Sequence, residues 1–83
     1  AKMKLNIDEF ETYAIEQGYE SGTELFETLG YTAEDYEDYK DGKNITREML
    51  MRLYTDIGAA DVVGFVDFGR YEWEENIDLF DKL

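Results

Sequence analysis

Apolar residues recur three and four positions apart over the first two thirds of the chain, which is the spacing of helices that bury one face. The pattern predicts four helices, over residues 6–18, 21–30, 32–42 and 46–58. Each begins at a residue whose side chain can accept a hydrogen bond from the first turn, and each ends at a glycine. The capping residues are Asn6, Ser21, Thr32 and Thr46, and the glycines are Gly18, Gly30, Gly42 and Gly58.

The apolar faces of these helices predict the core. We expect six side chains to be buried together, with Gly30 in the turn between the second and third helices: Leu25, Leu29, Tyr36, Leu50, Leu53 and Ile57. Three of the caps, Asn6, Ser21 and Thr32, are followed three positions later by an acidic residue, and at Ser21 and Thr32 this fits the pattern of a capping box.

The pattern after residue 58 fits more than one structure. Residues 59–68 could form a fifth buried helix or a strand. Gly64 and the β-branched residues favour a strand, whereas the spacing of Val62, Phe65 and Val66 favours a helix, which we expect. A short extended segment could follow near residues 68–73, and residues 74–83 have the pattern of a short amphipathic helix. The expected fold is all-α: a single domain over residues 1–83, a small bundle of about five helices whose core spans residues 6–58.

Composition restricts the chemistry. The 83 residues are 43% hydrophobic, which is enough apolar surface for one folded domain. Cysteine and histidine are both absent from the sequence, so disulfides, thiolate zinc sites and a histidine general base are excluded. We therefore expect no enzyme activity and no catalytic, cofactor-binding or metal-binding residues. No apolar run approaches the ~20 residues of a membrane span, and no signal peptide is visible, so we expect a cytoplasmic protein.

The charge is large and unevenly distributed. The chain has 21 acidic and 8 basic residues, a net charge of −13. Between Leu5 and Tyr39 there are eleven carboxylates and neither lysine nor arginine. Such a field repels nucleic acid and anionic lipid and attracts basic partners from a distance. A solvated acidic face that only keeps the protein soluble is the alternative interpretation.

The stretch from Ser21 to Ile57 has a recognisable order of residue types. A capped short helix leads to Leu-Gly, an apolar residue and a Ser or Thr, and then to an apolar residue, an aromatic residue and a glycine. In this chain those positions are Leu29, Gly30, Tyr31, Thr32, Tyr36, Tyr39 and Gly42. The sequence GKNIT that starts at Gly42 and the leucine-rich helix that ends at Gly58 match as well. This half of the chain resembles the helix-turn-helix of the phage Cro and repressor (XRE-like) family, which implies a helix-turn-helix core in the bundle.

In that family, the second helix of the motif lies in the major groove of DNA and reads bases from its N-terminal half. Carried over by position, the resemblance implies that the reading residues are Thr32, Ala33, Glu34 and Glu37. The family usually has a small residue where this chain has Phe26, and a glutamine that contacts phosphate where it has Gly22. Because nearly all non-specific affinity for DNA comes from lysine and arginine, we do not expect this acidic helix to bind DNA directly.

We expect the protein to act by contacts with other proteins instead. A rigid helical body that carries carboxylates could mimic DNA and inhibit a basic, nucleic-acid-binding partner, as small acidic proteins of phages and mobile elements do. The expected partner-binding residues are Glu20, Glu24, Glu27, Glu34, Asp35, Glu37 and Asp38. A Cro/repressor-like, DNA-binding transcriptional regulator is the alternative function.

Aromatic and branched residues near the C-terminus predict self-association. Small helix-turn-helix proteins commonly dimerise through a C-terminal segment, here residues 59–83. We expect a homodimer whose interface contains Val62, Phe65, Val66, Phe68 and Trp73.

Overall fold

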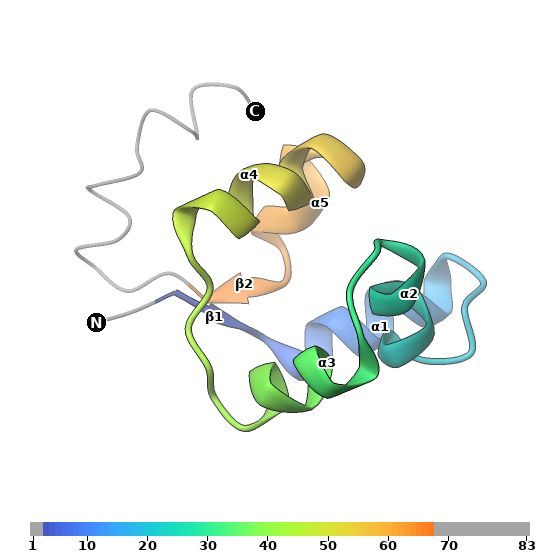
Figure 1. Cartoon of the computed structure of the whole chain (residues 1–83). Helices are drawn as coiled ribbons and strands as arrows, with labels where there is room; N and C mark the ends of the chain where they lie inside the picture. The colour runs from blue at the N-terminus through green and yellow to red at the C-terminus, as the bar shows by residue number, and fades with distance from the viewer. Residues whose placement is uncertain (1–2, 68–83) are drawn as a thin grey trace.

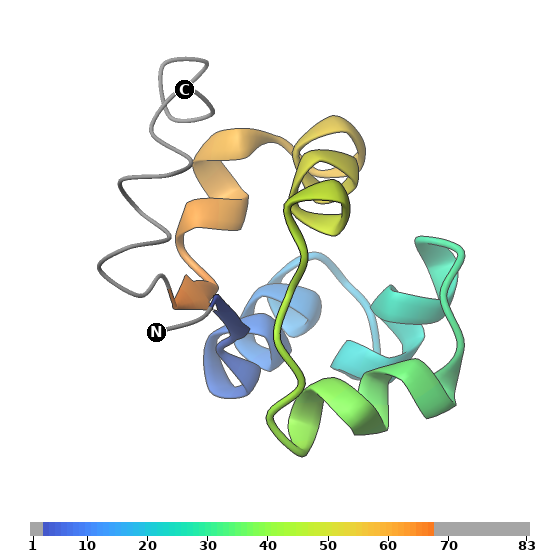
Figure 2. The same cartoon turned by 60° about the vertical axis from the view of Figure 1, so that its left-hand side comes forward.

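The computed structural model describes residues 3–67, which form five helices and a two-stranded antiparallel sheet. In chain order the elements are β1 (Lys4–Leu5), α1 (Ile7–Glu16), α2 (Gly22–Thr28), α3 (Ala33–Lys40), α4 (Arg47–Asp56), α5 (Ala59–Val63) and β2 (Val66–Asp67) (Figure 1). Two views show α4 and α5 on one side of the molecule and α1, α2 and α3 together on the other (Figures 1 and 2). Within residues 3–67, none of the helices has the length and apolar character needed to cross a membrane.

The first four helices begin where the sequence predicts. The side chains of Asn6, Ser21, Thr32 and Thr46 each accept a hydrogen bond from the backbone N–H three residues later. The expected capping box is complete at Thr32. At Ser21 only half of it forms, because the carboxylate of Glu24 accepts from the N–H of Glu20 at 2.7 Å, one residue before the cap. The four predicted glycines all have positive φ: Gly18, Gly30, Gly42 and Gly58.

The sheet is the main departure from the all-α prediction. β1 pairs with β2 in the register Lys4↔Asp67 and Leu5↔Val66, and the N–H of Asn6 donates to the carbonyl of Phe65 at 2.9 Å. Residues 59–67 combine both structures that their pattern allows, since a short helix, α5, precedes strand β2. The predicted extended segment near residues 68–73 and the helix over 74–83 lie outside the described residues. The coarser prediction, a small and mainly helical bundle, is confirmed.

The core confirms most of the predicted positions and extends beyond them. Leu25, Tyr36, Leu50 and Leu53 are buried, and Leu29 and Ile57 are half-buried against them. The core also includes residues before 6 and after 58, which the predicted core of 6–58 omits: Met3, Leu5, Val62, Phe65 and Val66. Strand pairing joins these two ends of the described chain, which explains why both contribute to one core.

Three residues of the expected dimer interface belong to this core. Val62, Phe65 and Val66 are at most 5% exposed within one chain, so their side chains offer almost no surface to a second copy. Their apolar pattern reflects packing against α1 and β1, since the Phe65 ring lies 5.0 Å from the ring of Phe10. Phe68 and Trp73 lie outside the described residues. Self-association remains a prediction, and it would need a surface other than these three side chains.

Candidate protein-interaction surface

Helix α3 has aromatic rings on its inner face and carboxylates on its outer face. The hydroxyl of Thr32 accepts from the N–H of Asp35 at 3.1 Å, and the Asp35 carboxylate accepts from the N–H of Thr32 at 3.4 Å. With the start of the helix fixed in this way, Tyr36 points inward and is 0% exposed. Residues three and four apart then share the outer face, and all of them are exposed: Glu34, Glu37, Asp38 and Asp41.

The predicted partner-binding residues lie on two neighbouring helices. Six of the seven are exposed, and Asp35, in the capping box, is half-buried. Helix α2 carries Glu24 and Glu27 three positions apart and lies beside α3 (Figures 1 and 2). Asp41 is an exposed acid of the same face that the prediction omitted. We call the outer residues of α3, together with its C-cap Asp41, the acidic face: Glu34, Glu37, Asp38 and Asp41.

Most of these carboxylates are not neutralised by cations. Among residues 3–67 the structure has one ion pair, in which Lys40 Nζ lies 3.3 Å from Glu37 Oε1. Both partners are solvent-exposed, at 37% and 64%, so water screens the pair and it contributes little. Within the described residues, the carboxylates of Glu34 and Asp38 accept no hydrogen bond and form no ion pair. The acidic face therefore retains nearly all of its negative charge.

Several basic side chains are held against tyrosine rings of the protein itself. The Lys40 ammonium lies 5.1 Å from the Tyr36 ring centre, that of Lys43 lies 5.4 Å from Tyr39, and the Arg52 guanidinium lies 4.9 Å from Tyr31. Lys4 donates hydrogen bonds to the carbonyl of Gly42 and to the side chain of Asn44. These cations contact aromatic and backbone groups of the chain itself, which are contacts that a phosphate backbone would have to compete with.

The rings beneath the acidic face pack around Phe26. Tyr31 stacks on Phe26 with a centroid distance of 4.6 Å, and the rings of Tyr36 and Tyr39 lie 5.3 Å and 5.8 Å away. Phe26 is fully buried at the position where the Cro and repressor family usually has a small residue. Burial raises the pKa of Tyr31, Tyr36 and Tyr39, so their hydroxyls stay protonated and add no charge to this side of the molecule. Phe26 thus holds α3 against α2 through aromatic contacts.

A polar junction joins α1, α2 and α3. The Tyr36 hydroxyl donates to Glu11 Oε1 at 2.5 Å, and the N–H of Gly22 donates to Glu11 Oε2 at 2.9 Å. Burial raises the pKa of Tyr36 first, and the hydrogen bond to Glu11 raises it further. A Cβ atom on Gly22 would lie 2.2 Å from the Tyr36 hydroxyl oxygen, so a larger residue there would displace the side chains of the junction.

Sequence reasoning did not identify Glu11. The available signal was its position on α1, because Glu11 has the same helical spacing as the inward residues Ile7 and Ala14. A carboxylate on an apolar face needs hydrogen-bond donors, and here the donors come from two other helices. The resemblance singled out Gly22, but as the position of a phosphate-contacting glutamine; its N–H instead binds the protein's own carboxylate.

The remaining predicted residues have structural roles or point to solvent. Of the readers that the resemblance implies, Thr32 caps α3 with its hydroxyl, while Ala33 is exposed and carries no polar group. Within residues 3–67, no group of three or more His, Cys, Asp or Glu side chains is arranged to hold a metal ion. No family model, no curated protein and no solved structure matches this chain.

Proposed function

We propose that this protein is an acidic interaction protein that competes with nucleic acid for a basic, nucleic-acid-binding partner. The observation that carries the proposal is the acidic face, four exposed carboxylates on one side of a capped helix that is anchored from beneath by buried rings. Surface charge arranged in this way speeds the encounter with a partner of opposite charge and disfavours nucleic acid.

The charge density of α3 supports the comparison with DNA. The eight residues of Ala33–Lys40 extend about 12 Å along the helix axis at about 1.5 Å per residue. Four of them are acidic, which gives one carboxylate per ~3 Å, close to the one phosphate per ~3.4 Å of a single DNA strand. A basic groove that recognises phosphate by charge would meet a similar field along this helix.

The junction of α1 and α2 also supports the proposal. The resemblance places a phosphate contact at Gly22, yet the N–H of Gly22 is already bound by the Glu11 carboxylate at 2.9 Å. A phosphate that approached here would meet this negative charge and would have to displace an existing hydrogen bond. The position that would help a relative of the Cro and repressor proteins to bind DNA would repel DNA in this chain.

A DNA-binding transcriptional regulator is the second candidate. The observation that favours it is the order of elements: α2, a turn in which Gly30 has φ 101°, and α3 with a complete capping box. This order is the one that the resemblance implies for a helix-turn-helix. Such a regulator would have to contact DNA through a surface other than the acidic face.

The proposal can be tested with two variants that have the same net charge. The test variant replaces the acidic face with lysine: Glu34→Lys, Glu37→Lys, Asp38→Lys and Asp41→Lys. The control variant replaces four exposed acids of α1 and α4: Glu9→Lys, Glu16→Lys, Glu48→Lys and Asp56→Lys. Immobilised wild-type protein should retain a basic protein from a native lysate, and added duplex DNA should release it.

The control variant should retain most of this partner, and the test variant at least about tenfold less, because each lost charge contact weakens both encounter and binding. The measurement is the quantity of retained protein, by mass spectrometry, before and after the duplex is added. If both variants lose the partner equally, retention depends on net charge alone and not on the acidic face. Retention that duplex DNA leaves unchanged would contradict competition with nucleic acid.

A further inference from the structure

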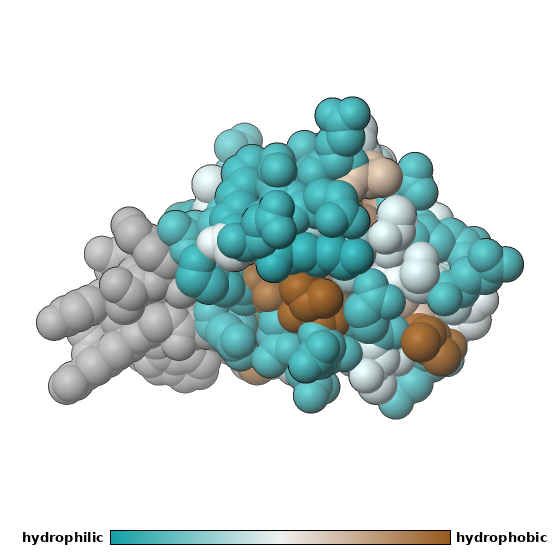
Figure 3. Space-filling view, turned by 90° about the horizontal axis from the view of Figure 1, so that it is seen from below, coloured by the Kyte–Doolittle hydropathy of each residue, from teal (hydrophilic) through white to brown (hydrophobic). Residues whose placement is uncertain are grey.

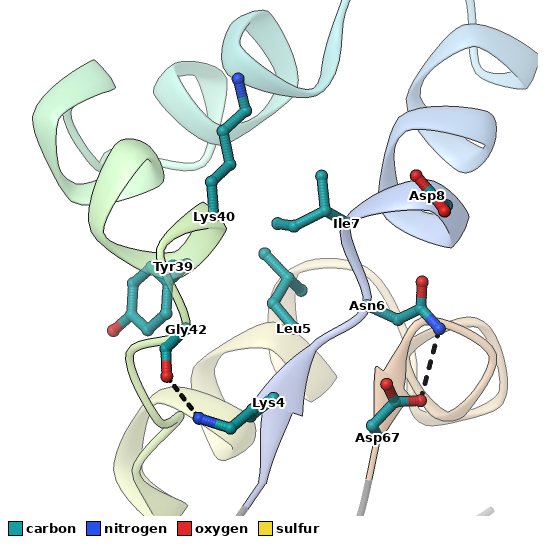
Figure 4. A pocket seen from close by; sticks show the side chains of 9 residues that line it. All are labelled: Lys4, Leu5, Asn6, Ile7, Asp8, Tyr39, Lys40, Gly42 and Asp67. Carbon is teal, nitrogen blue, oxygen red and sulfur yellow. Dashed lines mark hydrogen bonds between the residues drawn. The ribbon is translucent and has the colours of Figure 1, made fainter.

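A groove lies at the C-terminal end of α3, where this helix meets β1 and the start of α1. Its volume is about 300 Å³, at the lower end of the range for ligand pockets and large enough for one or two side chains. The apolar residues that line it are Leu5, which is 5% exposed, and the half-buried Ile7 and Tyr39 (Figure 4). Seen from below, an apolar area lies among hydrophilic residues on this side of the molecule (Figure 3).

Three polar side chains around the groove already have partners. The Lys4 ammonium donates to the carbonyl of Gly42, and the Asn6 amide donates to Asp67 Oδ1 at 3.4 Å (Figure 4). Lys40 extends away from Lys4 in the same view, and its ammonium pairs with Glu37. Polar recognition of a small molecule by these three side chains would have to break their contacts, whereas an apolar group could enter without doing so.

The groove continues the acidic face. Tyr39 and Lys40 line it from α3, and Glu37, Asp38 and Asp41 are the neighbouring acids of that helix. The carboxylates of Asp8 and Asp67 lie on its other side. Since Lys4 and Lys40 balance these two aspartates in the lining, the excess of negative charge beside the groove comes from the acidic face. That excess suits a partner segment rich in lysine and arginine.

We propose that this groove binds an aliphatic or aromatic side chain of a basic partner segment, whose lysines and arginines contact the acidic face. The inference rests on the proposed function and adds the contact that keeps the partner bound. Exposed charge pairs speed association but contribute little affinity each, whereas an apolar side chain in a groove with a polar rim slows dissociation.

Two synthetic peptides separate the two contributions. Both carry the same lysines and arginines, and they differ only at one central position, leucine in the first and serine in the second. Wild-type protein should bind the leucine peptide about tenfold or more tighter, because burying one aliphatic side chain has an effect of that size. The difference should lie in the dissociation rate and persist at high salt, whereas the association rate of both peptides should fall with salt.

Two isoleucines of α1 provide a matched pair of variants. Ile7 lines the groove, and Ile15, at the other end of the same helix, is 61% exposed. Ile7→Ala should remove most of the preference for the leucine peptide while affinity for the serine peptide is unchanged, which also verifies the fold. Ile15→Ala should leave both affinities at the wild-type value.

Three outcomes would overturn the inference. If wild-type protein binds both peptides equally, the groove contributes nothing, although the proposed function stands. If neither peptide binds even at low salt, the proposed function fails as well. If light scattering reports twice the chain mass of 9.7 kDa and Ile7→Ala restores the monomer, the occupant of the groove is a second copy of this chain.

Discussion

Helices α3 and α4 begin in the same way but differ in the charge of their outer faces. Each follows a threonine whose hydroxyl accepts a hydrogen bond from the N–H three residues later. Both direct an inner face into one core, through Tyr36 on α3 and mainly through Leu50 and Leu53 on α4. The outer face of α4 alternates the two signs of charge, as in Arg47, Glu48, Arg52 and Asp56, while that of α3 is acidic until Lys40.

The comparison of α3 with α4 separates the features that stabilise the fold from those that are available for binding. A cap, a terminal glycine and a buried inner face are present in both helices, so an acidic outer face is not required for a helix of this bundle to form. Excess charge of one sign destabilises a compact state through repulsion. The four carboxylates of the acidic face are therefore not explained by stability, which supports the proposed contact with a basic partner.

Disrupting the inner contacts of α3 should have the largest effect. A Cβ atom on Gly22 would lie 2.2 Å from the Tyr36 hydroxyl oxygen and 2.4 Å from Glu11 Oε1. Gly22→Ala should lower the free energy of unfolding by about 3 kcal/mol, through overpacking and loss of the junction hydrogen bonds. Urea denaturation followed by circular dichroism would measure it. Wild-type stability in this variant would show that the junction does not hold the three helices together.

Gly64→Ala is the matched control for this variant. A Cβ atom on Gly64 would lie 3.2 Å from the carbonyl oxygen of Asp61, a close contact that a small shift relieves. We expect a loss below about 1 kcal/mol in the same denaturation experiment. A loss as large as that of Gly22→Ala would mean that the protein tolerates no added methyl group at either site.

The second-largest effect should come from alkaline pH, which should weaken the contacts of Tyr36 on the inner face of α3. Burial, followed by the Glu11 hydrogen bond, raises the pKa of Tyr36 above its usual value of 10.0. Since the raised pKa belongs to the folded state, the stabilisation is complete below about pH 10 and is lost as the pH rises beyond it. Urea denaturation between pH 7 and pH 11 should show this decline.

Tyr36→Phe isolates the contribution of that hydroxyl. The variant should be about 1 kcal/mol less stable than wild type at neutral pH, because Glu11 loses one donor. Its stability should also fall less steeply above pH 10. Identical pH profiles for the two proteins would contradict a buried, protonated Tyr36.

The contact between α4 and the turn before α3 should have a smaller effect. The guanidinium of Arg52 lies 4.9 Å from the centre of the Tyr31 ring. Arg52→Ala should lower the free energy of unfolding by about 0.5–1 kcal/mol, the usual range for an exposed cation over a ring. Met51→Ala, at an exposed neighbouring position on α4, is the control and should be closer to wild type. Equal losses would indicate an effect of helix α4 as a whole.

Neutralising the acidic face should have the smallest effect on stability. The double change Glu34→Gln and Glu37→Gln should alter the free energy of unfolding by less than about 0.5 kcal/mol, as at most exposed sites. It should nevertheless slow association with a basic peptide several-fold at low salt, and the difference should shrink as salt is added. Stopped-flow fluorescence gives the rate, with Glu48→Gln and Asp56→Asn on α4 as the matched control. An equal slowing in the control would remove the distinction between the two helices.

The sequence predicted the local features of the fold well. Caps such as Thr32 and ends such as Gly30 depend on a few adjacent residues, so their signals are complete within a short stretch. The pairing of Leu5 with Val66 was missed, because it joins residues about sixty positions apart, and two-residue strands have no periodicity to detect. The same long-range packing turned Val62, Phe65 and Val66, expected at a dimer interface, into core residues.

The surface was predictable in part. Acids three and four apart on a helix that begins at Thr32 had to share one face once Tyr36 pointed inward. The roles of individual carboxylates were not predictable, since Asp35 and Glu24 bind backbone N–H groups of their own chain and Glu11 fastens two other helices. The sequence does not show whether a carboxylate faces solvent or a hydrogen-bond donor. That depends on how α1, α2 and α3 pack together.

The central claim is that α3 presents the charge of a nucleic acid rather than a surface that binds one. The most direct test is a fluorescence-anisotropy titration of a random-sequence duplex at about 0.15 M salt, with wild type and the variant that replaces the acidic face with lysine. Wild type should bind weakly or undetectably, and the lysine variant should gain non-specific affinity, because its outer face then supplies cations. Tight and sequence-selective binding by the wild type would contradict the account and favour a DNA-binding regulator.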